Sequence, residues 1–234
     1  MKKTRTLLLV ICLLAVAVIG GTLAYFTDTD DAKNVMTVGS VDIEQHEQER
    51  GEDGTLQAFT QNKPVVPGVG APKWGETIEV GDGKQKVMDV ENVIDKFDFV
   101  ENTGKSNAYV RTIIVLEAPG YDSEDLIHVN FNDSVGVTAT AWTPVDIEGV
   151  QYVYAVFTYT DALAPAAKTN VSLAQVYLDP KTTNEDVEAY GETWEILCLS
   201  QAAQEAGFDT AAEALDTAFG EATAANVADW FTAG

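Results

Sequence analysis

The chain has 234 residues, of which 37 are acidic and 14 are basic, and its formal net charge at pH 7 is −23. Nucleic acids and anionic membrane surfaces repel such a polyanion, so the composition excludes both as partners of the folded protein. The length is sufficient for one large β domain or two small domains, each with a buried core.

The first 24 residues have the pattern of a cleaved export signal. Three basic residues precede an unbroken apolar run over 7–19, and the small residues Thr22 and Ala24 occupy the −3 and −1 positions of a cleavage site before Tyr25. A membrane-spanning helix needs about 20 apolar residues, so the shorter run indicates cleavage and not a retained anchor. We therefore expect a secreted protein, in the extracellular matrix or at the cell surface, that meets the membrane only before signal cleavage.

Residues 25–43 predict an N-terminal arm that ends in a first strand. Apolar residues recur near its end, where Met36 and Val38 are followed by Val41 and Ile43. Alternation of this kind is typical of a half-buried strand.

Residues 44–86 predict a loop region. Polar and acidic residues dominate its first part, and proline and glycine recur over 61–75. Such a composition is typical of irregular chain, with room for a short hairpin around Gly81-Asp82-Gly83.

Residues 87–200 predict the core of a mainly β fold. Alternating or apolar segments lie roughly ten residues apart with turn residues between them. These segments are 95–100, 108–116, 126–131, 135–142, 152–159, 171–178 and 194–199. The spacing favours a jelly-roll-like antiparallel β sandwich.

Alanine and glutamate become frequent after position 200, and two short helices are expected within 201–234. Asp209 can cap the first helix. The apolar stripes of the two helices are Ala212, Leu215 and Phe219, and then Val227, Trp230 and Phe231. We expect these C-terminal helices to pack on the sandwich, and a partner-binding surface is the alternative.

Cys198 is the only cysteine outside the export signal. An exported chain with a single cysteine has no internal disulfide, so its core must be stable without one. Because Cys198 alternates with Ile196 in an apolar run, we expect a buried small side chain, with a reactive thiol as the alternative.

One short motif approaches a catalytic zinc site. His46 begins a His-Glu-x-x pattern, but Arg50 stands where the second histidine would be, and a cation cannot ligate zinc. The other histidine, His128, belongs to no catalytic constellation. The acid clusters lack the ligand spacing of a calcium loop, which leaves only weak Ca²⁺ binding open. The sequence therefore predicts no enzyme, no catalytic residue, no metal site and no cofactor.

The N-terminal stretch resembles the TasA/camelysin family of exported proteins, which a SipW-type signal peptidase processes. The family block Gly-Gly-Thr-x-Ala-x-Phe-x-Asp matches 20–28, and the block Asn-x-Phe-x-x-Gly-Thr/Ser-Leu/Val-Asp-Leu/Ile matches 34–43, with Met36 in the aromatic position. Further likeness is found at 100–111 and 194–208, and none at 44–90.

The resemblance implies a jelly-roll sandwich and, as in the fibre-forming members, a biofilm matrix protein. In those members the freed N-terminal strand adds to the next subunit, or to a related matrix protein, by donor-strand complementation. Here the assembly arm comprises Tyr25, Phe26, Met36, Val38, Val41 and Ile43. Two alternatives stay open: 34–43 can be the first strand of the chain's own sheet, and the protein can be a monomeric adhesin or Ca²⁺/carbohydrate-binding sandwich. The metallopeptidase activity attached to the name camelysin has no support at His46.

Overall fold

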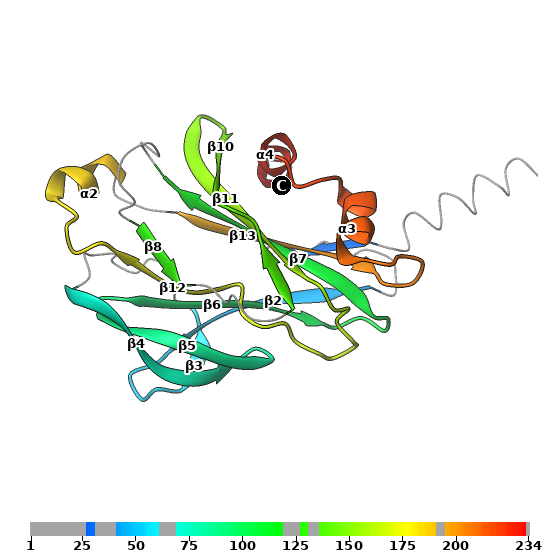
Figure 1. The fold of residues 1–234 in the computed structure, drawn as a ribbon, viewed down its shortest axis with the longest axis horizontal. Coiled ribbons are helices and arrows are strands. Elements are labelled where there is room, and N and C mark those ends of the chain that lie inside the picture. The colour runs from blue at the N-terminus through cyan, green and yellow to red at the C-terminus, as the bar shows by residue number, and fades with distance from the viewer. Residues whose placement is uncertain are drawn as a thin grey trace, which may run out of the picture.

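The fold is an antiparallel β sandwich, as predicted (Figure 1). The computed structural model describes residues 27–30, 41–60, 69–118, 127–130, 136–190 and 195–232. The described strands form two large sheets and a two-stranded hairpin. Their strand orders do not by themselves establish the jelly-roll connectivity that we expected.

The first large sheet, called sheet A below, has the strand order β1-β13-β7-β11-β10, and β9 also pairs with β11. Its strands are β1 (Thr27–Asp30), β7 (Ala108–Glu117), β9 (Val137–Ala139), β10 (Thr143–Ile147), β11 (Val150–Tyr159) and β13 (Ile196–Gln204). The central strand β7 is buried along nearly its whole length, because its β-branched residues are covered on both faces.

The second large sheet, called sheet B, has the order β3-β2-β6-β12-β8. Its strands are β2 (Ile43–Arg50), β3 (Leu56–Ala58), β6 (Ile94–Asn102), β8 (Ile127–Asn130) and β12 (Leu173–Leu178). The core between the two sheets joins Ile114 and Phe157 of sheet A to Leu173 and Val176 of sheet B. Alternating side chains from both sheets therefore meet in one interior layer.

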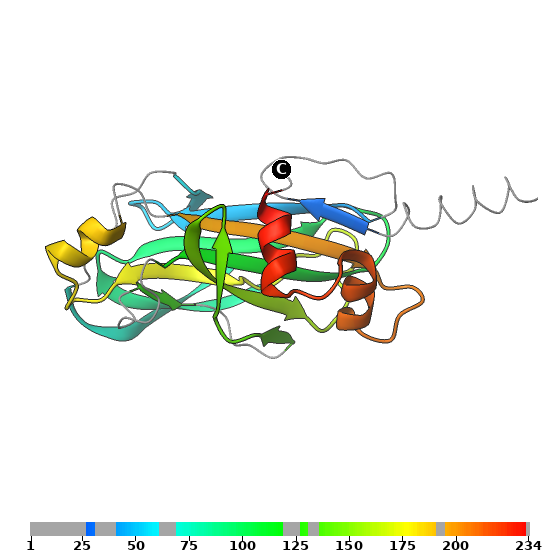
Figure 2. The same cartoon turned by 90° about the horizontal axis from the view of Figure 1, so that it is seen from above.

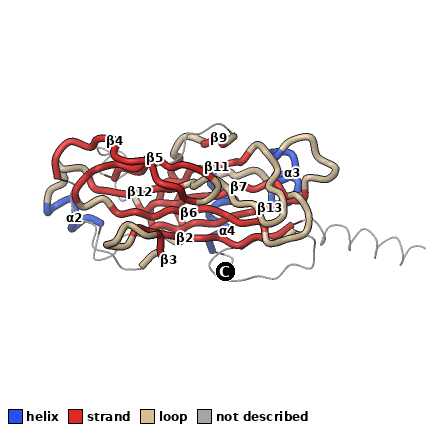
Figure 3. The backbone as a smooth tube through the Cα atoms, turned by 90° about the horizontal axis from the view of Figure 1, so that it is seen from below, coloured by secondary structure: helices blue, strands red, loops and turns tan. Residues whose placement is uncertain are grey.

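The prediction of a loop over 44–86 is wrong. Most of this segment is in β2, β3, β4 (Val69–Val80) and β5 (Gly83–Glu91), and β4 and β5 form a hairpin. The hairpin turns at Gly81-Asp82, as the glycine pattern indicated, and lies against sheet B (Figure 3). Its Val80 and Val87 cover Phe97 and Phe99, so the outer face of β6 is also buried. Strands therefore form in this segment, although its sequence is rich in polar residues, because the hairpin packs on sheet B.

Replacing Gly81 with alanine is expected to destabilise the protein by about 2–3 kcal/mol, because φ is positive there and strained for other residues. The φ of Gly81 is 61°, and an added Cβ would lie 2.5 Å from the carbonyl oxygen of Thr169. Gly54→Ala is the control, because φ is 79° there and no atom lies within 4 Å of the added Cβ. Its cost is expected to be about 1 kcal/mol. Equal losses for both variants in urea unfolding would contradict this account.

Helices cover the outer face of sheet A (Figure 2). Helix α3 (Ala211–Phe219) packs Ala214 and Leu215 on Tyr109, and helix α4 (Ala224–Thr232) packs Val227 on Ile113. The expected packing of the C-terminal segment on the sandwich is therefore observed. The predicted cap is wrong by one residue: the hydroxyl of Thr210, and not Asp209, accepts the backbone N–H of Glu213 at 3.2 Å.

Two further details of the helices differ from expectation. Ala212 is exposed, because the buried stripe of α3 begins at Ala211. A short helix α2 (Asn184–Tyr190) follows β12 and was not predicted. Thr183 and Asp186 cap it reciprocally, a Thr-x-x-acid signal that the sequence displays. Among the described residues, no helix is long and apolar enough to cross a membrane.

Candidate functional site

The N-terminal strand lies at one edge of sheet A. β1 pairs antiparallel with β13, with Thr27 opposite Ala203 and Asp30 opposite Ser200 (Figure 2, blue beside orange). The described part of the arm therefore completes a sheet of its own chain. Without β1, the outer backbone groups of β13 at these positions would form an open strand edge, which is a template for pairing with another chain.

The end of the predicted arm is part of the core. Val41 and Ile43 are buried and pack against Val100, Val110 and Ala202. Ile43 begins β2 and lies opposite Asn102 of β6. The arm thus has two parts, an edge strand at 27–30 and a core strand that begins at 43. The other predicted residues lie outside the described residues; they are Thr22, Ala24, Tyr25, Phe26, Met36 and Val38.

The small residues of β13 suit it to a neighbouring strand. Ser200, Ala202 and Ala203 are fully or almost fully buried, and Ser200 shares a 3.0 Å hydrogen bond with Thr112 of β7. β13 is fixed by nine register pairs with β7, whereas β1 adds only four register pairs on its other side. β13 is therefore well fixed in the sheet, whereas the strand β1 that covers its edge is short.

His46 and Arg50 serve in separate contacts of sheet B. The Nε2 atom of His46 lies 3.2 Å from Glu101, and its ring stacks on Phe99 at a centroid distance of 5.0 Å. The Nη2 atom of Arg50 donates to Asp95 at 3.0 Å, and this pairing raises the pKa of Arg50. Both residues lie on a strand, so the geometry of a helical zinc motif is missing here.

His128 pairs with an acid at the other edge of sheet B. Its Nε2 atom lies 2.7 Å from Oδ2 of Asp179, and its ring stacks on Tyr177 at 5.0 Å. The hydrogen bond with His128 lowers the pKa of Asp179. This pair is a local surface contact between β8 and the end of β12.

A polar cluster inside the sandwich was missed by the sequence analysis. Lys96 and Asp98 point inward from β6, Glu47 points inward from β2, and Cys198 faces them from β13. Ser172 donates to Oδ2 of Asp98 at 2.7 Å. Alternation along β6 was visible in the sequence, but it could not tell that Phe97 and Phe99 face the hairpin and leave the charged residues inside.

The cluster also bears on metal binding. Ligand atoms of Glu47, Asp98 and Cys198 lie within 4.8 Å of one another. Lys96 is in contact with Glu47 and supplies the positive charge that a metal ion would otherwise bring. Burial raises the pKa of the Cys198 thiol well above its ordinary value, which disfavours the thiolate that metals require. The described cluster therefore contains an internal ion pair between Lys96 and Glu47.

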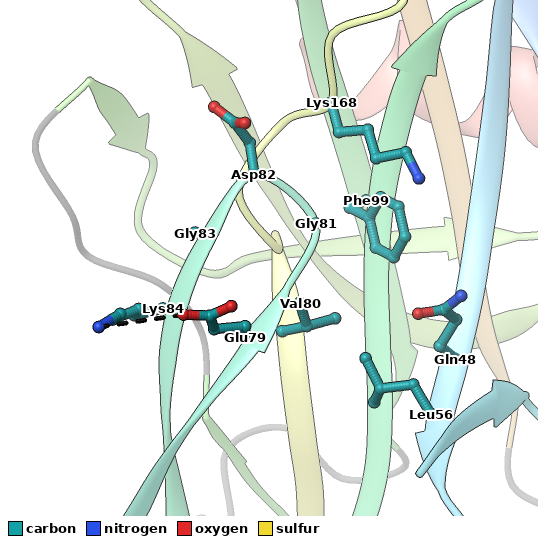
Figure 4. Close-up of a pocket in the computed structure, with 10 residues that line it drawn as sticks. All are labelled: Gln48, Leu56, Glu79, Val80, Gly81, Asp82, Gly83, Lys84, Phe99 and Lys168. Atoms are coloured by element: carbon teal, nitrogen blue, oxygen red, sulfur yellow. Dashed lines mark ion pairs between the residues drawn. The ribbon is translucent and has the colours of Figure 1, made fainter.

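A groove lies between the hairpin tip and the strands β2 and β3 (Figure 4). Its volume is ≈ 540 Å³. It is lined by Gln48, Leu56, Glu79, Val80, Gly81, Asp82, Gly83, Lys84, Phe99 and Lys168. Lys84 and Glu79 pair across 4.0 Å at its rim. The lining combines charges of both signs with the apolar side chains of Leu56, Val80 and Phe99, which suits a small ligand that has polar and apolar parts.

Two features of the described residues are candidate functional sites, and no known protein helps to choose between them. A strand edge occupied by a short N-terminal strand is the feature of the described residues that best fits assembly, and the groove best fits a small ligand. Comparison with protein-family models, with curated proteins and with solved structures found no match for this chain.

Proposed function

We propose that the protein is a secreted structural component of the extracellular matrix that forms fibres by exchanging its N-terminal strand between copies. The proposal joins the resemblance to the TasA/camelysin family with one observation. A strand of only four residues, β1, occupies the edge of sheet A beside β13. In a fibre, β1 of one copy would occupy the same edge of the next copy, so each subunit would gain the pairing that it gives up.

The length of chain between the two parts of the arm supports this exchange. Ten residues, 31–40, separate β1 from the described residues that begin at Val41. A segment of that length spans up to about 35 Å when extended, so β1 can move well away from the edge of its own sheet. Val41 and Ile43 stay in the core of their own subunit, so they anchor the arm while β1 is exchanged.

Export processing fits the same scheme. We propose that a SipW-type signal peptidase cleaves before Tyr25, two residues ahead of β1. An uncleaved chain would keep β1 tied to the membrane, so cleavage would free the strand for pairing with another copy. Assembly would then begin only outside the cell.

Deleting residues 25–30 from the mature protein is expected to abolish fibres and to leave a folded sandwich. The core contacts of Val41 and Ile43 remain in this variant, so circular dichroism should be close to that of the intact protein. Electron microscopy of the two proteins at equal concentration is the measurement. Fibres of unchanged yield from the shortened chain would refute the exchange.

A reversible lock provides the matched control. Thr27 and Ala203 are direct partners in the β1–β13 register, so cysteines at both positions can join β1 to its own subunit. The oxidised T27C/A203C protein should stay monomeric and should form fibres again after reduction. The single variants should assemble under both conditions.

The alternative function is a monomeric adhesin that binds a carbohydrate or Ca²⁺. The groove beside Leu56 and Lys168 is the observation that favours it. This alternative predicts a protein that stays monomeric over a wide range of salt and concentration. A change of Lys168→Ala would then weaken glycan binding without altering the oligomeric state.

A further inference from the structure

The charged cluster inside the sandwich places an amine against a carboxyl group. Nζ of Lys96 is in contact with Oε1 of Glu47, and these residues belong to the neighbouring strands β6 and β2. The side chain of Lys96 is 5% exposed and that of Glu47 is 28% exposed. The amine of Lys96 is therefore buried, while the carboxyl group of Glu47 is partly exposed to solvent.

The surroundings of Lys96 cover the amine side of the contact. Its Nζ lies 4.6 Å from the centre of the Phe59 ring, which covers it from the β3 side. Asp98 is completely buried beside it and directly opposite Glu47 in the register of the two strands. An amine held against a carboxyl group in such a site has a very high effective concentration.

We propose that Lys96 and Glu47 form an intramolecular isopeptide bond that joins β6 to β2. The new bond links Nζ of Lys96 to Cδ of Glu47. One carboxyl oxygen of Glu47 leaves as water, so an ammonium and a carboxylate become a neutral amide and one water molecule. No oxidant, nucleotide or metal is needed.

The proton transfers can be assigned within the cluster. Burial lowers the pKa of Lys96, but the carboxylates of Glu47 and Asp98 raise it, and the net shift is upward. The pair therefore starts as ammonium and carboxylate, and one proton must first pass from Nζ to Glu47. The neutral amine then attacks Cδ, and the second proton of the amine leaves with the departing oxygen. Because the first step is uphill, the bond should form slowly after folding.

Asp98 is the residue that can relay the second proton. Its carboxyl oxygen lies within 4.8 Å of that of Glu47. Burial raises its pKa to about 6, so it exchanges a proton near neutral pH. Gln45 and Ser172 hold its two oxygens in place at 2.9 and 2.7 Å.

The reaction also relieves an electrostatic cost. Keeping the charge of Lys96 out of water is unfavourable even when it is paired. The amide has no net charge, and the water can leave past the exposed side of Glu47. The site therefore favours condensation that bulk water would oppose.

The test is the mass of the purified, secreted protein, with its N-terminus sequenced. The proposal predicts a mass one water below the sequence mass and a branched peptide that joins the segments of Glu47 and Lys96. A protein at its full sequence mass, with only linear peptides, would overturn the proposal and leave an internal ion pair.

Variants distinguish this bond from other losses of water. K96R keeps the positive charge but lacks the primary amine, and it should show the full sequence mass. Lys73 pairs with Asp89 at 2.9 Å on the exposed hairpin, so K73R is the matched control and should keep the deficit of one water. D98N should show a mixture of both masses that shifts toward the bond with time. A deficit that persists in K96R would overturn the assignment, whether or not the protein forms fibres.

Discussion

Replacing Arg111 with methionine is expected to lower the free energy of unfolding by about 3 kcal/mol. Arg111 lies on the outer face of sheet A, beneath the junction of α3 and α4, and is almost fully buried. Its guanidinium donates to Gln201 at 2.7 Å, to Asp216 at 2.8 Å and to the carbonyl oxygen of Gly220 at 2.9 Å. The guanidinium carbon also lies 5.1 Å from the centre of the Trp230 ring.

The size of this loss follows from the hydrogen-bond acceptors that remain without a donor in the variant. Methionine fills much of the space, but the buried Gln201 side chain and the carbonyl of Gly220, the residue after α3, lose their donors. Asp216 is partly exposed and recovers water, so its ion pair contributes less than a fully buried one. Burial lowers the pKa of Arg111, although Asp216 raises it in part. The charge is thus tolerated only because all of these acceptors surround it.

Urea unfolding followed by circular dichroism measures the effect. The control is Lys73→Met, which removes an ion pair whose side chains are 71% and 63% exposed and should change stability by less than about 0.5 kcal/mol. A loss below about 1 kcal/mol for Arg111→Met would mean that the helices are held by their apolar contacts alone. In that case Arg111→Met and Lys73→Met should have similar unfolding free energies.

Stability is expected to fall as the pH rises from about 4 to about 6, because of Asp98. Burial, partly offset by hydrogen bonds and by Lys96, raises its pKa from the ordinary 3.8 to about 6. Between these values the folded state binds the proton more strongly than the unfolded state, so raising the pH favours unfolding. A shift of about two pKa units corresponds to about 3 kcal/mol, all of it lost above pH 6.

Other acids also titrate in this range, so a comparison with Asp98→Asn is needed. The asparagine does not titrate, and the unfolding free energy of the intact protein minus that of the variant isolates Asp98. This difference should decrease from pH 4 to pH 6 and stay level above. For Asp179→Asn the difference should stay level over this range and decrease only as the pH falls below about 4, because the hydrogen bond with His128 lowers the pKa of Asp179. A flat profile for Asp98 would contradict the raised pKa.

The prediction is compatible with the proposed bond between Lys96 and Glu47. Lys96 lowers the pKa of Asp98 and Glu47 raises it, and condensation would remove both charges. Burial is the largest cause of the shift and would be unchanged. The direction of the pH effect therefore does not depend on whether the bond has formed.

Strands with a strong pattern were predictable from the sequence. The apolar run of β7 and the alternation of β11 gave nearly correct bounds, because their side chains meet a hydrophobic layer on each face. The glycine turn at Gly81 was also visible. The position of a turn depends on local conformation, which the sequence encodes directly.

What could not be predicted depends on neighbours far along the chain. β2 and β4 are rich in polar residues and are ordered by pairing with β6 and β5, respectively. Asp98 alternates with Phe97 in β6, and only the position of the hairpin decides which of them faces the interior. The same holds for β1, since its four residues carry no sign of the edge that they occupy. Tertiary contacts override the local pattern in each case.

The covering of both sheets limits how copies of this protein can associate. Helices α3 and α4 lie over the outer face of sheet A, and the β4–β5 hairpin lies over part of sheet B. In the described part of the chain, the strand edges are thus the places where another copy can pair with the main chain. If each subunit gives one strand and receives one, its valence is two, and growth is linear and unbranched. Any network made from such fibres would need a second kind of cross-connecting molecule.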